Sequence, residues 1–399
     1  MKPGDLYAFG VLFLAVLMSL LGIGTVVPFL PKILSDLGSS GLIIGAIFAG
    51  FSLTRFLGMP FAGYWGDRFG RKMFLVIATS GHILTAIGYV IAQDSILWLG
   101  VVRVINGFVS AIAVPVAMAY AGTLTRKAKE GLTMGVFNMA VFAGFGGGPL
   151  VGGFIYSRFG YEMVFYAMGA ISTLALIMLL FLPEQKREPE HLSIWQQYKE
   201  VLSGRIILAI FVHRVVLSGG RAAAMAFLPI LAVDAWNLSE FQIGIALTAR
   251  IWLVTVLQPV FGWVADRKNR VAMIIIGSVG ASLGLFLIPH TGNFPLLLAV
   301  CIGIGLFGAV SIPASTAIAV TEGRRLGMGQ VMAVFNMGMP MGHLLGFLVC
   351  GWVMDKMGII WLFYFAGFIS IFGIALFIYL LYGIKSKVPS SYGNLEGGS

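Results

Sequence analysis

The sequence predicts an all-α polytopic membrane protein, with twelve transmembrane helices in two pseudo-symmetric six-helix bundles. Three observations predict this fold: the composition, the number of long apolar segments, and a repeat that relates the two halves. Of the 399 residues, 59% are hydrophobic and 11% are charged, whereas soluble domains carry about 25% charged residues. This composition indicates a chain that lies mostly within a lipid bilayer.

A helix needs about 20 apolar residues to cross the hydrocarbon core of a bilayer. Glycine, proline and charged residues divide this chain into twelve such segments. They span residues 6–30, 41–64, 73–93, 95–123, 131–156, 161–182, 206–233, 239–264, 271–289, 294–321, 327–354 and 358–383. The long polar stretch 183–204 is predicted to be a cytoplasmic linker between the bundles 1–182 and 205–388. Residues 389–399 are expected to be a tail, part of it appended by cloning.

The lysines and arginines predict the orientation of the chain. With a cytoplasmic amino terminus, 18 of the 26 lie on the cytoplasmic side and three on the opposite side. Cytoplasmic loops of membrane proteins are enriched in these residues. We therefore expect a multi-pass protein of a bacterial-type inner cell membrane, with both termini in the cytoplasm. The formal charge of +10 then reflects orientation, and no nucleic-acid partner is expected.

Few residues suggest covalent chemistry. Cys301 and Cys350 lie in apolar segments without a CxxC pattern, so we predict buried thiols rather than a disulfide or a metal site. The sequence contains neither a P-loop pattern nor the pattern of a catalytic triad. ATP-driven pumping and soluble-type catalysis are therefore disfavoured, and no cofactor is expected.

The two halves repeat each other. Gly107-Phe108 matches Gly305-Leu306, and Val136-Phe137-Asn138 matches Val334-Phe335-Asn336, both at an offset of 198 residues. Parallel repeats of this size are typical of transporters whose substrate site lies at the repeat interface near mid-membrane. The repeat therefore predicts transport as the function class.

A charged turn joins the second and third segments. Its glycines allow close helix approach and a tight turn, and its aspartate is suited to a helix amino terminus. The residues of the pattern are Gly63, Asp67, Arg68, Gly70, Arg71 and Lys72. A degenerate copy follows 199 residues later, with Asp266 and Arg267. This copy has Asn269 where the first has glycine, so we expect it to be less constrained.

The fifth segment contains a glycine-rich run, Gly144-Phe145-Gly146-Gly147-Gly148-Pro149-Leu150-Val151-Gly152-Gly153. Glycines flatten one helix face for close packing, and proline bends the helix. The residues that define the pattern are Gly144, Gly148, Pro149, Gly152 and Gly153. Generic packing of small residues is the alternative interpretation of this run.

The charged turn, its copy, the glycine run and Arg103-Val104-Ile105-Asn106-Gly107 together resemble the major facilitator superfamily (MFS), and within it the twelve-helix drug/proton antiporters. The resemblance covers residues 5–385. It implies the MFS fold, a monomer, and transport by rocking of two halves driven by a proton gradient. It also implies that the turn latches the halves on the cytoplasmic side, and that Arg103 takes part in proton coupling. The family often has an aspartate where this chain has Thr123, so the latch is expected either to be weaker or to use Glu130 instead.

Arginines provide most of the charge predicted to lie within the membrane. Besides Arg103 they are Arg55, Arg214, Arg221 and Arg250, whereas none of the 16 acidic residues falls in mid-span. Intramembrane charges usually face a cavity or a partner, and guanidinium groups suit carboxylate or phosphate. We therefore predict substrate-binding arginines and an anionic or amphiphilic substrate. The alternatives are that some arginines bond backbone carbonyls, and that Arg103 extends to the interface.

Two asparagines and two histidines complete the candidate site. Asn138 and Asn336 occupy matching positions in the two halves, where they could face substrate or bond between helices. His213 and His343 are predicted proton carriers, with a packing role as the alternative. The function predicted is proton-coupled export of a small organic compound. Organic-anion uptake or facilitated diffusion, and lipid or lysolipid flipping, are the alternatives.

Overall fold

The computed structural model of the protein describes residues 3–124, 130–184, 204–326 and 328–382. Within these ranges it leaves the side chains at 3, 63–65, 67–69, 130–135, 223–225, 323–326, 328–330, 333 and 382 undescribed. The described residues form helices joined by short turns. The first helices are α1 (Pro3–Val26), α2 (Leu30–Asp36), α3 (Gly41–Phe69), α4 (Arg71–Ala92), α5 (Ile96–Thr123), α6 (Glu130–Phe159) and α7 (Tyr161–Leu180). The others are α9 (Arg205–Ala226), α10 (Leu228–Trp236), α11 (Glu240–Ala265), α12 (Arg270–Leu287), the 3₁₀ helix η1 (Ile288–His290), α13 (Phe294–Leu326), α14 (Met328–Met357) and α15 (Ile359–Tyr382).

Eleven segments among the described residues are long and apolar enough to cross a membrane. They match the predicted spans except the one at 206–233. There the chain forms two helices, α9 and α10, and α9 includes His213, Arg214 and Arg221. Together with Arg205, α9 carries three charged side chains, more than the span-length window of any of the other eleven segments, which explains the difference.

The chain divides into two compact units. The first unit is Met1–Leu192 with Met225–Thr248, and the second is Ser193–Ala224 with Ala249–Ser399. The first therefore includes α10 and the beginning of α11, which follow the predicted linker in sequence. The predicted bundle boundaries at 182 and 205 stay a prediction.

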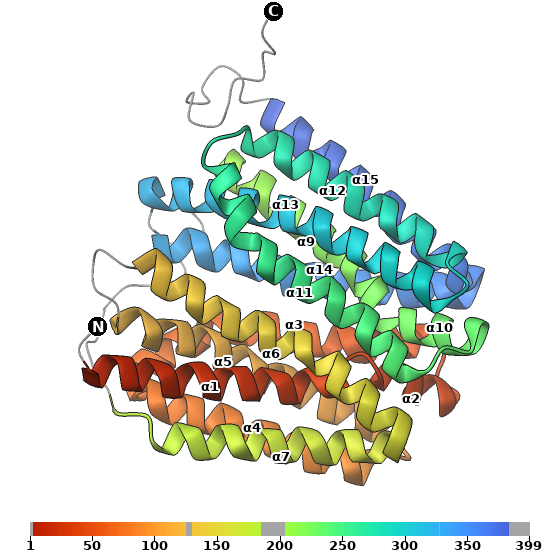
Figure 1. Ribbon diagram of the computed structural model, residues 1–399, viewed down its shortest axis with the longest axis horizontal. Helices are drawn as coiled ribbons and strands as arrows, with labels where there is room; N and C mark the ends of the chain where they lie inside the picture. The colour runs from red at the N-terminus through yellow and green to blue at the C-terminus, as the bar shows by residue number, and fades with distance from the viewer. Residues whose placement is uncertain (1–2, 125–129, 185–203, 327, 383–399) are drawn as a thin grey trace, which may run out of the picture. The chain divides into compact units, whose positions relative to one another are not determined.

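In the first unit, α1 packs on α6 and α7, α4 lies between α5 and α7, and α3 packs on α5 (Figure 1). Lys32 in α2 pairs with Asp36, and also with Asp234 of α10 at 3.0 Å. This ion pair helps hold α10 on α2. Gly70, with φ of 107°, ends α3 and allows the tight turn into α4.

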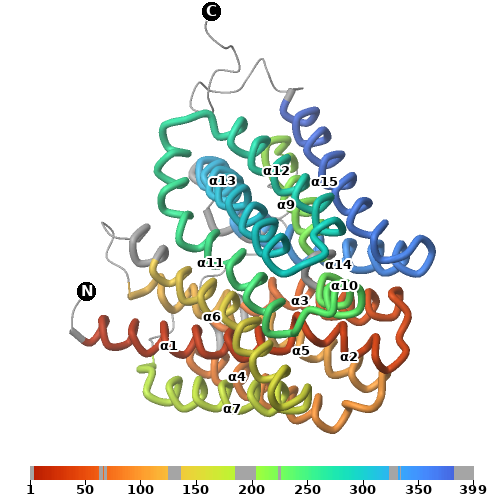
Figure 2. Tube along the Cα trace, turned by 45° about the vertical axis from the view of Figure 1, so that its right-hand side comes forward, coloured from red at the N-terminus to blue at the C-terminus, as the bar shows by residue number. Residues whose placement is uncertain are grey.

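In the second unit, α12 packs on α13 and α15, and α14 also contacts both (Figure 2). One buried cluster joins these helices; its members include Ile274, Ile318, Phe335 and Phe377. Cys301 and Cys350 are buried and free, which confirms the predicted thiols. Large apolar side chains such as Phe372, 71% exposed, cover the outer helix faces, as expected of helices in lipid.

Candidate functional site

The glycine run of α6 is a helix-packing surface. A Cβ atom added at Gly144, Gly148 or Gly152 would overlap the α1 backbone, at Leu17, Gly24 and Thr25 respectively. These three glycines lie four residues apart, so they share one helix face. Only glycine allows α6 and α1 to approach this closely.

A second face of the same run, one residue further along the helix and so about 100° round it, packs on α11. A Cβ at Gly153 would overlap the carbonyl of Glu240, and one at Gly244 would overlap the carbonyl of Pro149. Near this contact the Phe154 and Phe241 rings meet edge to face, with centroids 5.9 Å apart. The predicted close packing is thus present on both faces, whereas the link of this run to antiport stays a prediction.

The second unit repeats the α6–α1 contact between α14 and α9. A Cβ at Gly342 would overlap the carbonyl of Val215, and one at Gly346 would lie 2.6 Å from the Cα of Gly219. Gly342 and Gly346 are 198 residues after Gly144 and Gly148. The sequence repeat therefore preserves a backbone contact.

The first charged turn bonds to the ends of neighbouring helices. Arg71 Nη1 donates to the carbonyl oxygen of Ala119 in α5 at 3.1 Å, and Lys72 Nζ donates to that of Leu180 in α7 at 2.9 Å. Cations near helix carboxyl ends compensate unsatisfied carbonyls and the helix dipole. Thr123 donates to the carbonyl of Tyr120 at 2.8 Å.

The predicted turn residues Gly63, Asp67 and Arg68 lie outside the described side chains. What the structure describes is therefore the part of the turn that follows Gly70. Both of its described cations, Arg71 and Lys72, bond within the first unit. The expected latch role stays a prediction.

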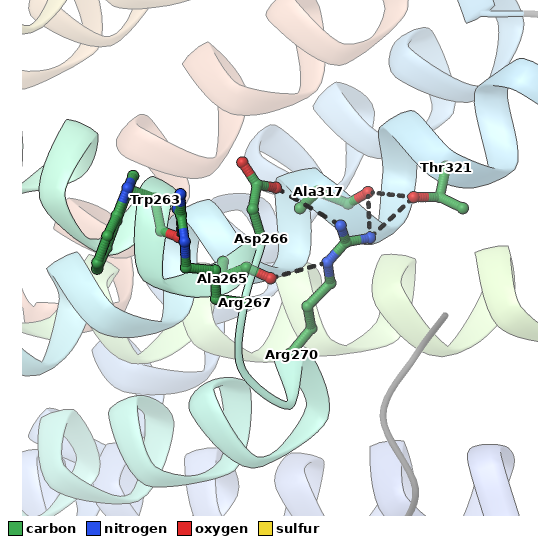
Figure 3. A network of polar contacts seen from close by, with 7 residues as sticks. All are labelled: Trp263, Ala265, Asp266, Arg267, Arg270, Ala317 and Thr321. Carbon is green, nitrogen blue, oxygen red and sulfur yellow. Dashed lines mark hydrogen bonds and ion pairs between the residues drawn. The ribbon is translucent and has the colours of Figure 1, made fainter. Parts of the chain in front are cut away.

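The copy of the turn, in the second unit, is a network around Arg270 (Figure 3). The Arg270 Nε donates to the Ala265 carbonyl at 3.1 Å, and Nη1 donates to Thr321 Oγ1 at 2.9 Å and to the Ala317 carbonyl at 3.4 Å. The carboxylate of Asp266 lies 3.6 Å from Nη2. The side chain of Arg270 therefore links the turn to α13 by bonding to one backbone carbonyl, that of Ala317, and to one side-chain hydroxyl, that of Thr321.

The two arginines of this copy differ in their contacts with described residues. Arg267 donates to the Trp263 carbonyl at 3.2 Å and lies 4.0 Å above the Trp263 ring. The residue that bridges to α13 is Arg270, which the offset of 199 residues aligns with Arg71, and the expected latch role of Asp266 and Arg267 stays a prediction. Asn269 does not loosen the turn, because its side chain caps α12 by accepting from the amides of Val271 and Ala272.

Arg103 lies inside the first unit. It is 2% exposed, and its guanidinium carbon lies 4.5 Å from the Phe48 ring centroid and 4.1 Å from that of Phe51. A Cβ at Gly107 would overlap the carbonyl of Phe51, so α5 and α3 are in close contact here. The alternative in which Arg103 extends to the interface is wrong.

Polar side chains surround Arg103 and form a first-unit arginine cluster of Arg55, His82, Arg103 and Asn106. The Asn106 amide donates to Thr85 Oγ1 at 3.0 Å and lies 3.4 Å from His82 Nδ1. Arg55 is within electrostatic range of both Arg103 and His82. The Nε atoms of Arg55 and Arg103 are buried without a hydrogen-bond partner among the described residues.

A second-unit arginine cluster consists of Arg214, Arg221, Arg250 and Asn336. The guanidinium of Arg214 lies 4.0 Å from the Phe335 ring centroid, and its Nη2 donates to Asn336 Oδ1 at 3.4 Å. Arg221 is within electrostatic range of Arg214 and Arg250. A Cβ at Gly305 would lie 2.6 Å from the Arg250 carbonyl, which repeats the contact made by Gly107.

The predicted histidines and asparagines differ in their surroundings. His213 is 2% exposed, with Nε2 2.8 Å from Ser278 Oγ and its ring beside Phe377, and its predicted role as a proton carrier stays a prediction. His343 is half-buried, with its ring centroid 5.6 Å from that of Phe347. Asn138 is half-buried and, unlike Asn336, makes no side-chain hydrogen bond with a described residue.

The repeated turn, the repeated glycine contacts and the helical fold agree with a comparison to known families. The chain matches the Major Facilitator Superfamily over residues 12–219 and 210–396. It belongs to this superfamily. As a member, the protein is a multi-pass membrane transporter and not an enzyme.

Individual members show how far the similarity extends. The chain is 28% identical over 369 residues to an uncharacterized MFS-type transporter of Methanocaldococcus jannaschii, covering 90% of this chain and 95% of that protein. It is 25% identical over 381 residues to Multidrug resistance protein 2 of Bacillus subtilis, covering 92% and 94%. The nucleoside transporter NupG has the same fold, with a TM-score of 0.80 at 15% identity over 94% of this chain and 99% of that one.

Proposed function

We propose that this transporter exports a small organic compound, anionic or amphiphilic, in exchange for protons and by alternating access of the rocker-switch type. One observation carries the choice of substrate. Five arginines, Arg55, Arg103, Arg214, Arg221 and Arg250, lie on segments that the sequence predicts to cross the membrane, and none forms an ion pair in the described parts of the chain.

The free energy of burying charge supports an anionic substrate. A buried cation is unfavourable unless it is paired or hydrogen-bonded. The buried Nε atoms of Arg55, Arg103 and Arg214 have no acceptor among the described residues. A carboxylate or phosphate group on a substrate would supply acceptors in the planar arrangement that guanidinium groups prefer.

The relatives support export. Multidrug resistance protein 2 of Bacillus subtilis aligns with nearly the whole chain, and its name refers to drug resistance. Proton exchange is proposed from the resemblance at Arg103 and the glycine run Gly144–Gly153. Because the buried imidazole of His213 bonds to Ser278, we propose His343 as the proton carrier. The lysine and arginine distribution supports cytoplasmic termini.

A transport assay in liposomes tests this proposal. The purified protein would be reconstituted with an imposed pH gradient, and matched organic anions and cations would be compared by counterflow. We expect gradient-driven movement of anions that falls at least about tenfold in Arg55→Gln and Arg250→Gln, since each removes an interaction of a charged group worth 1.5–3 kcal/mol. Arg158→Gln, which changes an exposed arginine, is the matched control.

Each remaining outcome contradicts a stated part of the proposal. Cation transport that survives Arg55→Ala and Arg250→Ala would overturn the anionic substrate. If the rate of anion movement does not depend on the pH gradient and is unchanged in His343→Gln, the protein catalyses facilitated diffusion rather than proton exchange. Movement of fluorescent lipid without movement of solute would indicate a flippase.

A further inference from the structure

A groove runs between α4 and α7, which lie side by side in the first unit (Figures 1 and 2). Its volume is about 290 Å³. Small residues form its floor and larger apolar residues its sides; the residues used below are Ala86, Ile87, Ile91, Tyr166, Gly169 and Ala170. Ile91 is 80% exposed and Tyr166 53% exposed, so the groove opens outward.

Both helices of the groove are membrane-spanning segments, so the medium at its opening is lipid. A Cβ atom added at Gly169 would lie 3.4 Å from the Cβ of Ala86, an ordinary van der Waals contact. The two helices are therefore close at the floor of the groove, where both residues are small. Small-molecule pockets typically measure about 300–1,000 Å³. The groove is at the lower limit of that range and suits one hydrocarbon chain better than a bulky solute.

Two carboxylates lie beyond one end of the groove. On α7, Glu162 precedes Tyr166 by four residues and Ala170 by eight, so it continues the face that lines the groove. On the other side, Asp94 follows Ile91 by three residues, just after α4 ends. The end of the groove near Ala92 therefore has a carboxylate on each side, Asp94 just after α4 and Glu162 on α7.

The two carboxylates are close to the same aromatic residue. Asp94 and Glu162 both lie within electrostatic range of Tyr161, whose ring meets that of Phe165 edge to face at 6.4 Å. Phe165 lines the groove. Both carboxylates are exposed, and neither forms an ion pair within the described ranges, including with Arg158 at the end of α6.

We propose that this groove binds a phospholipid with an ammonium-bearing headgroup, such as phosphatidylethanolamine. One acyl chain lies along Ala86, Gly169 and Ala170, and the ammonium group lies between Asp94 and Glu162. An anionic headgroup would be repelled by the same two carboxylates. In the predicted orientation the lipid comes from the outer leaflet. The proposal does not depend on the transported substrate.

Native mass spectrometry of the purified full-length protein tests this binding. Phosphatidylethanolamine and phosphatidylglycerol with identical acyl chains would be added at equal concentrations. We expect the wild type to retain about three to five times more phosphatidylethanolamine, the size expected of exposed charge pairs. The double variant Asp94→Asn/Glu162→Gln would lose this preference. Glu184→Gln, which removes an exposed carboxylate beyond the other end of α7, would keep it.

A groove-filling variant tests the position of the acyl chain. Ala170→Phe would lower retention of both lipids, whereas Leu84→Phe, at a lipid-facing position 68% exposed on α4, would not. Size-exclusion chromatography and thermal unfolding without added lipid would verify that each variant is folded. The proposal fails if the double amide variant keeps the preference, or if Ala170→Phe retains as much lipid as Leu84→Phe. It also fails if the groove proves to bind a second copy of the chain instead.

Discussion

At the scale of single residues, two of the buried arginines contact aromatic rings and pair with no carboxylate among the described residues. Arg103 lies between Phe48 and Phe51, and Arg214 lies against Phe335. A desolvated cation–π contact contributes about 2 kcal/mol or more. The rings stabilise the guanidinium groups but do not neutralise their positive charge. The charge can therefore still attract an anion.

The contact between Arg103 and Phe51 leads to a stability prediction. Phe51→Leu should lower the free energy of unfolding by about 2 kcal/mol, because the ring that faces the buried cation is lost. Thermal unfolding in detergent measures the change. Phe372→Leu, at a position 71% exposed to lipid, is the control and should change little. Equal losses in both variants would show that the ring contact contributes nothing.

A second residue-scale prediction concerns the helix cap at Asn269. Its side chain accepts from two amides at the start of α12, at 3.0 and 3.1 Å. Asn269→Ala should lower the free energy of unfolding by about 1 kcal/mol, whereas Asn269→Asp should preserve the cap. Chemical or thermal unfolding of the two variants decides the matter. If Asn269→Asp is as destabilised as Asn269→Ala, the cap is not what stabilises this turn.

At the scale of helices, glycine position determines which pairs approach closely. Gly148 meets the backbone of Gly24, whereas a Cβ at the adjacent Gly147 would meet only the end of the flexible Leu21 side chain, at 3.1 Å. Gly148→Ala should therefore separate α6 from α1, at a cost of roughly 1–3 kcal/mol, the range for overpacking. Gly147→Ala is the neighbouring control, because the Leu21 side chain can move.

For both glycine variants we would measure the thermal stability in detergent and the yield of folded protein. We expect Gly148→Ala to lose folded protein and Gly147→Ala to resemble the wild type. Comparable stability of the two would contradict the close approach of α6 to α1. The result would also test whether the glycine run is a packing surface, because Gly144 and Gly152 lie on the same helix face as Gly148.

The helices could be predicted well from the sequence, because long apolar segments separated by charged turns leave few alternatives in a bilayer. The segment 161–182, for example, corresponds to α7, Tyr161–Leu180. The partners of individual side chains could not be predicted in the same way. One acceptor of Arg71 is the backbone carbonyl of Ala119, and no side-chain pattern in the sequence indicates which carbonyl accepts a bond. The bonds of Arg270 to the carbonyls of Ala265 and Ala317 could not be predicted for the same reason.

At the scale of the whole molecule, the repeat preserves contacts as well as residue types. Arg71 donates to the carbonyl of Ala119, and Arg270 donates to that of Ala317. The arginines are 199 residues apart and their acceptors 198 apart. Each contact lies within its own unit. The two halves of the sequence therefore stabilise their charged turns by the same interaction, made separately in each unit.

Arginine variants of the two turns test this independence. Arg71→Gln and Arg270→Gln should each destabilise the protein, since a hydrogen bond from a charged group contributes about 1.5–3 kcal/mol. Arg270→Gln removes the bonds to Ala265 and Thr321 as well as the bond to Ala317. In the double variant the two losses should add to within about 0.5 kcal/mol, as expected of sites whose described contacts lie in separate units. Unfolding of the four proteins in one detergent measures this. A double loss that departs from the sum by more than about 1 kcal/mol would mean that the turns interact through the rest of the molecule, which the contacts within each unit do not predict.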